Sequence, residues 1–392
     1  MNGQPENQLD TFQDQSIAVY GGGGGWGDRI TRAASNLFGK TRIVEQKATP
    51  AEAIAAARES DILFMATPDP VINDLLIEVR NQLRPGKGVI DCATNKSGFA
   101  DTLTSLAEDG VSVCSTHPMV KPETSPRGQT VIIMPIGEHA QLAQQVAQRI
   151  FVEMGMRPEE LDFAQHADMM VILQMVPHLI HRILIHAMAH GLQAQEMSIE
   201  DVSRLAPANY LLSELGVGRV GIQRPEVSAG IVMTALQTPL GHRVLGGIQE
   251  TIGRIIAADK REELSALFTS DVNLLDPNGS WREEMTKRTD AALTRLGNLR
   301  LRSFQVTVPD RPAVLRDVLS IMHDLHDIDM TALDSQIIDQ EDGTALARFD
   351  VGITDQQLDF QKLAVDLERV GASITFPRSA LKSQGLSPEA TD

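Results

Sequence analysis

The chain has few cysteines and few positive charges. Its 392 residues include two cysteines, Cys92 and Cys114, and both fall within apolar, strand-like stretches. We therefore expect buried free thiols in a reducing compartment. Lysine and arginine number 35 against 52 carboxylates, for a formal net charge of −17. This charge argues against nucleic acid as a partner, because a phosphate backbone requires a basic surface. An acidic protein that binds a small anion must gather its few cations in the binding site.

The sequence also lacks long apolar runs. No run reaches the roughly 18–20 residues that would span a bilayer. Residues 1–15 are polar and lack the basic start and apolar middle of a secretory signal. Both absences predict a cytoplasmic protein with no membrane partner. The length predicts two or three domains, and 42% apolar with 22% charged residues is ordinary for a globular protein.

Short β-branched stretches alternate with amphipathic helical stretches over residues 16–162. The expected strands are 16–20, 42–45, 61–66, 88–92, 111–115 and 130–134, and the expected helices are 26–38, 49–59, 71–83 and 99–108. Such alternation predicts an α/β dinucleotide-binding domain of the Rossmann type, with a parallel, doubly wound sheet.

Strands disappear over residues 163–297, where Leu, Ile, Met and Ala recur at helical spacing. Interruptions at Ala206-Pro207 and Asp276-Pro277 divide the stretch, which predicts an all-helical second domain. Helices over 170–188 and 241–256 are very apolar and need a surface to pack against. We therefore expect this domain to form a homodimer interface and to contribute to the substrate site.

Alternation returns over residues 299–378. The expected elements are strand 303–308, helix 313–325, strand 332–338, strand 345–353, helix 356–370 and strand 373–376. This βαββαβ order predicts a ferredoxin-like domain. Residues 1–15 and 379–392 are expected to be flexible tails.

A glycine-rich turn follows the first expected strand. Gly22, Gly24 and Gly27 fit the G-x-G-x-x-G spacing of dinucleotide-binding turns. The first glycine permits the tight turn, the second lets the pyrophosphate approach the backbone, and the third lets the helix pack on the strand. Gly25 and Trp26 open that helix, whose N-terminus faces the phosphates. Five consecutive glycines match many templates, so the position between strand and helix carries the prediction.

Two residues flank the expected cofactor site. Glu45 closes the second strand, where a carboxylate accepts hydrogen bonds from the adenosine ribose and repels a 2′-phosphate. This favours NAD over NADP, although Lys47 weakens the preference. Thr67 follows the third strand, and we expect it near the adenosine. The alternative is a glycine loop without a ligand and a solvated Glu45.

His117 follows the fifth expected strand and precedes a proline. Carboxyl ends of the strands meet at one edge of such a sheet, so His117 should open onto the same crevice as the glycine turn. A histidine there suits a base that works near neutral pH. The alternative is a structural histidine, which is the commoner role for a single imidazole.

Several motifs together resemble the prephenate and arogenate dehydrogenases, over roughly residues 16–290. They are the glycine turn with residues 26–29, Val44-Glu45-Gln46, residues 91–96, His117-Pro118-Met119, His166-Ala167-Asp168 followed by Gln174 and His178, and Gly218-Arg219 after Ala206-Pro207. The combination is fairly specific, whereas each motif alone is not.

The resemblance implies an NAD-dependent oxidative decarboxylation of prephenate in tyrosine biosynthesis. It makes His117 the catalytic base for the ring hydroxyl, and Thr94 a residue that orients this base and the nicotinamide. Arg219 matches an arginine that binds a substrate carboxylate, His178 a histidine that contacts the substrate, and Glu123 an acid near the pocket mouth. The C-terminal unit resembles an ACT domain, a regulatory module that often binds an amino-acid effector.

The chain departs from the family pattern at three places. Val120-Lys121 stands where the family usually has an aromatic or small residue and then glycine after His-Pro-Met, which removes a flexible hinge and adds a cation that we expect beside the substrate. Pro177 precedes His178 within a helix and should kink it. Ala313 stands where the ACT ligand loop usually has glycine, which puts amino-acid binding there in doubt.

Other functions compete with this interpretation. Arogenate dehydrogenase performs the same chemistry on an amino-acid substrate. A β-hydroxyacid dehydrogenase would use a catalytic lysine on the helical domain, and a non-catalytic ligand sensor would not need Thr94, His117, His178 and Arg219 together. His186 and His190 have the i,i+4 spacing of a zinc pair, but without a third ligand nearby we expect no metal.

Overall fold

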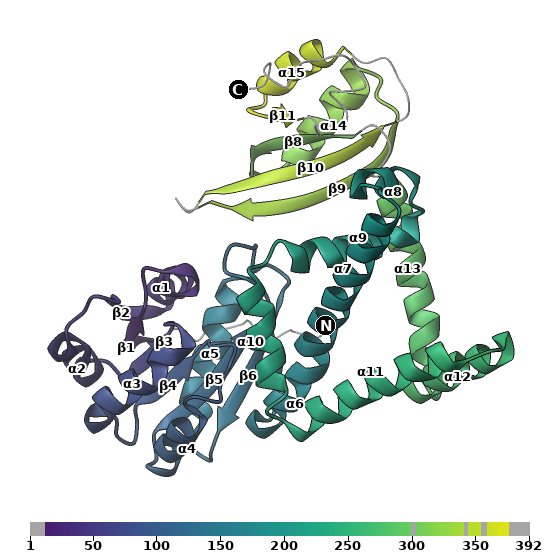
Figure 1. Cartoon of the computed structure of the whole chain (residues 1–392). Helices are drawn as coiled ribbons and strands as arrows, with labels where there is room; N and C mark the ends of the chain where they lie inside the picture. The colour runs from purple at the N-terminus through teal and green to yellow at the C-terminus, as the bar shows by residue number, and fades with distance from the viewer. Residues whose placement is uncertain (1–11, 299–302, 341–343, 354–358, 376–392) are drawn as a thin grey trace, which may run out of the picture. The chain divides into compact units, whose positions relative to one another are not determined.

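The computed structural model describes residues 12–298, 303–340, 344–353 and 359–375, and the chain forms two compact units, Met1–Met170 and Val171–Asp392. The first unit contains a seven-stranded sheet in the order β2-β1-β3-β4-β5-β6-β7 (Figure 1). Its strands are β1 (Phe12–Tyr20), β2 (Phe38–Val44), β3 (Ile62–Met65), β4 (Gly88–Asp91), β5 (Ser112–Pro118), β6 (Thr130–Ile136) and β7 (Arg157–Glu160).

Strands β1 to β5 are parallel, as expected, but β6 pairs antiparallel with β5, and β7 runs parallel to β6. The expectation of a wholly parallel sheet is therefore wrong at this edge. No helix separates β5 from β6, and a parallel return needs a crossover of about a dozen or more residues, usually helical. The first part remains doubly wound: β2 and β3 lie on opposite sides of β1, so the chain reverses its winding beside β1.

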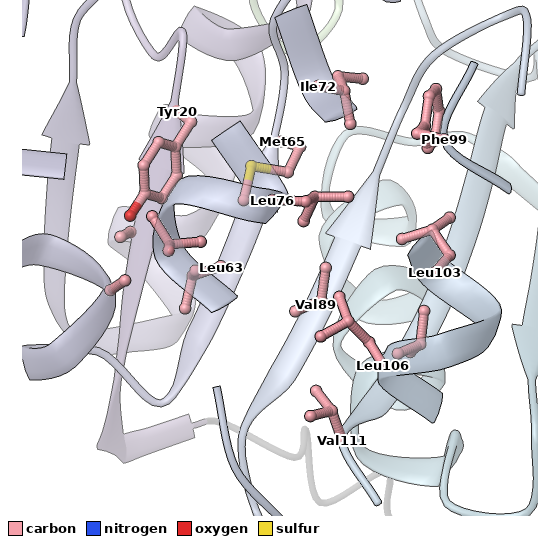
Figure 2. Packing of buried hydrophobic residues seen from close by; sticks show 14 of the residues in the cluster. Tyr20, Leu63, Met65, Ile72, Leu76, Val89, Phe99, Leu103, Leu106 and Val111 are labelled. Atoms are coloured by element: carbon pink, nitrogen blue, oxygen red, sulfur yellow. The ribbon is translucent and has the colours of Figure 1, made fainter. Parts of the chain in front are cut away.

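Helices cover both faces of this sheet. They are α1 (Gly25–Leu37), α2 (Pro50–Glu59), α3 (Asp69–Val79) with the 3-10 turn Arg80–Gln82, α4 (Ala100–Glu108) and α5 (Gln141–Glu153). Alternate residues of β1 enter two cores: Ile17 and Val19 pack with α1 and α5, whereas Ala18 and Tyr20 pack with α2 and α3. Figure 2 shows the second of these cores, in which Leu63, Met65 and Val89 of the sheet meet Ile72 and Leu103.

The first strand is longer than expected. Residues 12–15 were expected in the N-terminal tail, but β1 begins at Phe12, whose ring stacks on Phe38 of β2 with centroids 5.1 Å apart. The register with β2 is irregular between Phe12 and Ser16. The polar Gln13, Asp14 and Gln15 hide this extension in the sequence. Residues 1–11 and the expected C-terminal tail lie outside the described residues.

The second unit begins with helices, as expected. A short helix α6 (His166–Met170) at the end of the first unit leads through a π-helical turn, Val171–Met175, into α7 (Val176–Ala194). The others are α8 (Ile199–Leu205), α9 (Ala208–Gly221), α10 (Pro225–Ala235), α11 (Pro239–Ala257), α12 (Arg261–Leu275) and α13 (Ser280–Asn298). The breaks after α8 and α12 coincide with the expected interruptions at Pro207 and Pro277. The π-turn ends two residues before Pro177, which cannot donate a backbone hydrogen bond.

The helical stretch Phe163–Ala194 is long and apolar enough to cross a membrane by length and composition, and 22% of its most apolar window is buried in the structure. The sequence shows no unbroken apolar run there, because histidines and Arg182 interrupt it. Large apolar side chains are exposed on α7, α10 and α12, among them Ile180, Ile183, Met233, Phe268 and Leu274.

The C-terminal part has the expected βαββαβ order. Its elements are β8 (Ser303–Pro309), α14 (Val314–Ser320) with the π-helical turn Ile321–Leu325, β9 (Met330–Asp339), β10 (Ala345–Ile353), α15 (Phe360–Glu368) and β11 (Ser373–Thr375). The antiparallel sheet has the order β11-β8-β10-β9, which is the ferredoxin-like arrangement. Phe304, Val306 and Val308 of β8 form its core with both helices.

Candidate active site at the carboxyl edge of the first sheet

The glycine turn joins β1 to α1. Gly21 has a φ of +79° and donates its N–H to the Val44 carbonyl (2.8 Å), so the chain turns sharply. A Cβ on Gly27 would lie 1.9 Å from the Gly21 carbonyl oxygen, and only glycine lets α1 pack this close to β1. A Cβ on Gly24 would meet nothing nearer than that oxygen, at 3.9 Å. The space that Gly24 leaves is at the N-terminus of α1, where a pyrophosphate would meet unpaired N–H groups.

The other members of the turn have distinct neighbours. A Cβ on Gly22 would lie 2.8 Å from Cγ2 of Ile43, so this glycine permits close contact with β2. Gly25 begins α1 at a φ of +28°. The Trp26 indole lies edge-to-face with Phe151, at 6.5 Å between centroids. The Trp26 ring therefore packs against the core and not into the glycine turn.

Glu45 and Thr67 approach the turn from the neighbouring strands. Glu45 directly follows β2 and is exposed, and its Oε1 lies 2.6 Å from where a Cβ on Gly23 would be. Thr67 follows β3, and its Cγ2 lies 3.1 Å from the corresponding position on Gly21. The Thr67 hydroxyl is buried and has no hydrogen-bond partner among the described residues. The structure thus brings both predicted cofactor residues to the glycine turn.

His117 lies within β5, which extends to Pro118 because β6 pairs with it that far. Its side chain is 2% exposed, so the expectation of an imidazole open to a crevice is wrong for this structure. His117 Nδ1 lies 3.1 Å from Nε2 of His166, and the two rings meet edge-to-face. His166 begins α6 and is 4% exposed. Two buried imidazoles therefore share one hydrogen bond.

A buried ion pair lies next to these histidines. Lys96 Nζ donates to Asp91 Oδ1 (2.6 Å) and to the carbonyl of Thr116 (2.7 Å), the residue before His117. The Thr116 hydroxyl in turn donates to the Asp91 carbonyl (2.6 Å). Asp91 and Lys96 are 0% and 6% exposed. These bonds tie the end of β4 to β5 at the histidine.

The surroundings keep both imidazoles neutral. Burial lowers the pKa of His117 well below its ordinary value of 6.5, and the charge of Lys96 and the neighbouring His166 lower it further. Burial and Lys96 likewise lower the pKa of His166 to about 4. At neutral pH both rings are therefore in the unprotonated form, the form in which an imidazole can act as a base.

The loop after His117 lies against the start of α1. Arg29 Nε donates to the carbonyl of Pro122 (2.8 Å), and Pro122 Cγ lies 3.2 Å from where a Cβ on Gly25 would be. Lys121 and Glu123, on either side of Pro122, are exposed. The structure therefore places both predicted substrate residues on a loop that contacts the glycine turn.

Thr94 is exposed on the loop after β4. Among the described residues no hydrogen bond joins its side chain to His117, whose Nδ1 faces His166 instead. Its orienting role therefore stays a prediction.

The predicted substrate residues of the second unit separate into two environments. His178 on α7 is buried, and its Nδ1 lies 3.3 Å from the hydroxyl of Ser228 on α10. Arg182, one turn later, donates to the same hydroxyl (3.2 Å) and to the Val220 carbonyl (3.1 Å). Arg219, in the last turn of α9, is exposed. Among the described residues no group of three or more His, Cys, Asp or Glu side chains could hold a metal ion.

Sequence reasoning did not assign roles to His166, Lys96 or Arg182. Signals existed for two of them: Lys96 ends the same motif as Thr94, and Arg182 lies at i+4 from His178, on the same helical face. His166 belongs to a noted motif, but it is 49 residues from His117, and periodicity carries no information on such a contact.

Residues 34–160 match the family model for the nucleotide-binding domain of prephenate dehydrogenase, which includes Glu45, Thr67, Thr94 and His117 and begins after the glycine turn.

Two relatives and a solved structure illustrate what this chain is similar to. The chain is 25% identical to the 4-amino-4-deoxyprephenate dehydrogenase of Streptomyces pristinaespiralis over 245 residues, which is 62% of this chain and 79% of the relative. It is 26% identical to a Methanocaldococcus jannaschii protein named "Probable arogenate/prephenate dehydrogenase" over 182 residues, 46% of this chain and 40% of the relative. The Aquifex aeolicus prephenate dehydrogenase, solved with hydroxyphenyl propionate and NAD+, aligns at 12% identity with a TM-score of 0.47, over 67% of this chain and 98% of that one.

Proposed function

Because this chain belongs to the prephenate and arogenate dehydrogenase family, we propose that it oxidatively decarboxylates prephenate with NAD to form 4-hydroxyphenylpyruvate, a step toward tyrosine. One observation carries the proposal. A neutral, buried imidazole, His117, lies at the carboxyl end of β5, in the sheet whose first turn is a glycine-rich dinucleotide motif.

His117 is the base in this reaction. Bound NAD would supply the hydride acceptor for the ring carbon that bears the hydroxyl, and His117 would accept the hydroxyl proton. Loss of the ring carboxylate as CO₂ then restores aromaticity, which makes the step effectively irreversible. A positioned base accelerates such proton transfers by roughly 10²–10⁴-fold. The lowered pKa of His117 keeps the imidazole in the form that accepts a proton.

The glycine turn binds the cofactor. Gly22, Gly24 and Gly27 shape the turn, and the N–H groups of Gly25 and Trp26 are the ones that would hold the pyrophosphate. Glu45, whose carboxylate lies beside Gly23, accepts hydrogen bonds from the ribose and repels a 2′-phosphate, so NAD is preferred. Thr67 lines the other side of the turn, and its unpaired buried hydroxyl is available to the dinucleotide.

Cations and polar groups hold the substrate. Arg219 is the proposed partner of a substrate carboxylate and His178 the proposed contact of the ring. Lys121 and Glu123 are the residues proposed for the pocket mouth, and Thr94 is the one proposed for the nicotinamide. Each charge-assisted hydrogen bond of an arginine to a carboxylate contributes about 1.5–3 kcal/mol. Arg182 is a second candidate for this anchor, since it is half-buried one turn from His178.

The remaining proposals concern the whole chain. We assign residues 16–162 to the cofactor, 163–297 to substrate binding and dimerisation, and 299–378 to an ACT-like regulatory domain, in a cytoplasmic homodimer. Exposed apolar side chains on α7, α10 and α12 supply a surface for a second copy. An amino acid is the effector that such a domain would take, and Ala313, with a φ of +67°, occupies its loop in a conformation that favours glycine.

One assay tests the function. Purified protein is mixed with NAD or NADP and with prephenate, arogenate or 4-amino-4-deoxyprephenate, and the absorbance of the reduced nicotinamide is followed. We expect reduction of NAD with prephenate. Arogenate dehydrogenase is the main alternative, and turnover of arogenate alone would assign that activity instead. No reduction with any of the three substrates would refute the proposal.

A further inference from the structure

We infer that Arg182 is a specificity-determining residue of the second unit: its guanidinium, held by Ser228 and by the Val220 carbonyl, binds a carboxylate of the substrate and favours a dianion over a substrate that carries an ammonium group. This inference rests on the proposed function, in which the substrate is a dicarboxylate. It gives a role to a cation on α7, in addition to the role that the family resemblance implies for Arg219.

Two neighbouring helices hold the Arg182 guanidinium in one orientation. Arg182 is half-buried on α7, and its Nη2 donates to the carbonyl of Val220 on α9 (3.1 Å) and to the hydroxyl oxygen of Ser228 on α10 (3.2 Å). Val220 and Ser228 are themselves buried. A side chain that is oriented before a ligand arrives loses less conformational entropy on binding. The contacts therefore prepare this guanidinium for an anion.

The two bonds leave part of the guanidinium for a ligand. An arginine has five N–H donors, and both bonds of Arg182 start from Nη2. Within the part of the chain that the structure describes, its Nε and Nη1 form no hydrogen bond, and no Asp or Glu forms an ion pair with it. A half-buried charge without a counterion is costly, and a carboxylate from a ligand would offset that cost.

The helices around Arg182 carry few acidic side chains. Helix α7 contains no Asp or Glu. Helix α9 contains Glu214, which accepts a hydrogen bond from a serine of α8, and α10 contains Glu226, which is exposed in the first turn. A second cation, Arg219, lies in the last turn of α9, directly before the residue whose carbonyl Arg182 contacts. The charges on these three helices therefore favour a ligand with more than one carboxylate.

Ser228 connects Arg182 to a residue that is already proposed to contact the substrate. Its Oγ lies 3.3 Å from Nδ1 of His178, which is one turn before Arg182 on the same side of α7. Gln223, in the connection between α9 and α10, is 8% exposed, and its buried Oε1 has no hydrogen-bond partner among the described residues. A cation without a counterion and an acceptor without a donor are the groups that a polar, anionic ligand would satisfy.

Net charge distinguishes the candidate substrates. Prephenate carries two carboxylates, whereas arogenate carries two carboxylates and an ammonium group. Arg182 and Arg219 attract a dianion, and a half-buried guanidinium repels a nearby ammonium more strongly than an exposed one does. Such repulsion rejects one ligand without any new contact to the other. We therefore expect Arg182 to raise the preference for prephenate over arogenate.

The test removes the charge of Arg182 and compares the two substrates. R182Q keeps an amide that can donate to Val220 or Ser228. We expect it to raise KM for prephenate roughly 10- to 100-fold with little change in kcat, as for loss of a charge-assisted hydrogen bond. For arogenate the lost attraction and the lost repulsion offset each other, so the ratio of the two kcat/KM values should fall roughly tenfold or more. If arogenate is not turned over, its inhibition constant replaces KM.

Other variants separate substrate binding from helix packing. R182K keeps the charge and should keep most of the preference, and R254Q, which removes an exposed cation in the last turn of α11, should behave as wild type. S228A removes one of the two bonds that hold Arg182, and we expect a roughly 2- to 10-fold higher KM for prephenate. A lower melting temperature of R182Q with equal changes for both substrates would mean that Arg182 only joins helices, and an unchanged KM would also overturn the inference.

Calorimetric titration with prephenate distinguishes this inference from the proposed function. Weaker binding to R182Q than to the wild type supports the inference even if the wild type does not reduce NAD with prephenate, a result that refutes only the proposed function. Reduction of NAD with equal prephenate affinity in both proteins overturns only the inference, and no binding to the wild type overturns it as well. If R182Q does not fold, R182K and S228A are titrated instead, and affinities equal to that of the wild type would overturn it.

Discussion

At the scale of single residues, the base is the most direct point to test. We expect His117→Ala to lower kcat by roughly 10²–10⁴-fold with little change in KM, because a base acts in the transition state and contributes little to ground-state binding. Steady-state kinetics with prephenate and NAD measure both constants. His139→Ala, a change at an exposed histidine of the same unit, is the control. A kcat near the wild-type value would remove His117 from the mechanism.

The carboxylate anchor is the second residue-scale prediction. Arg219→Ala should mainly raise KM for prephenate by roughly 10-fold or more, since about 1.5–3 kcal/mol per charged hydrogen bond is lost. Lys121→Ala and Arg182→Ala are measured beside it. If KM is unchanged in the Arg219 variant but raised in one of the others, that cation holds the carboxylate.

The residues differ in how far sequence could identify them. His117 and the glycine turn were found because each follows a strand, and strand ends meet at one edge of a parallel sheet. The burial of His117 was not found, because it depends on how far β6 pairs with β5. Its contact with His166 joins two elements 49 residues apart, and such a contact requires the fold.

At the scale of elements, a matched pair of substitutions can test the roles of two glycines at the junction between β1 and α1. Gly27→Ala should destabilise the first unit or prevent its folding, because the added methyl would lie 1.9 Å from the Gly21 carbonyl oxygen. Gly24→Ala should leave the fold intact but weaken NAD binding, because its methyl enters the space for the pyrophosphate. Thermal unfolding and NAD titration by calorimetry distinguish the two. Equal melting temperatures in both variants would contradict the assigned packing role of Gly27.

The buried histidine pair also makes the first unit sensitive to acid. In the unfolded chain His117 and His166 titrate near 6.5, whereas the fold lowers the pKa of His166 to about 4 and that of His117 well below 6.5. Below pH 6.5 the unfolded state therefore binds more protons, and the free energy of unfolding falls as the pH decreases toward 4. Each histidine removes up to about 1.4 kcal/mol per pH unit in this window.

Tryptophan fluorescence can follow this effect in the intact chain. Trp26 lies in the first unit and Trp281 in the second, so W281F leaves a reporter on the first unit. Urea unfolding of W281F from pH 7 to pH 4 should show a smaller loss of stability when H117N and H166Q are added. An identical pH dependence in the triple variant would show that other groups govern acid sensitivity.

Sequence patterns recovered most helices and strands of the first unit but not its far edge. Strand β7 has the sequence Arg-Pro-Glu-Glu, is largely exposed and lacks apolar alternation, as an edge strand often does. The antiparallel turn into β6 had a signal in the sequence: no helical stretch separates the two expected strands. Strand–helix alternation predicts parallel strands only as far as helices separate the strands, and here it ends at β5.

At the scale of the whole molecule, the exposed apolar helices predict self-association. We expect a dimer by light scattering, and Ile183→Glu should shift it toward monomer, since a buried charge without a partner costs several kcal/mol. Lys287→Glu, a change on an already charged helix, is the control. A monomeric wild type would mean that another partner covers these side chains.

The burial of the His117 side chain limits which reagents and ligands can reach it. An imidazole that is 2% exposed is screened from dissolved acylating agents as well as from bulk water. If His117 is the base, a substrate that reaches it from solvent would have to displace the side chains that enclose it, and its arrival would be coupled to a rearrangement of the protein.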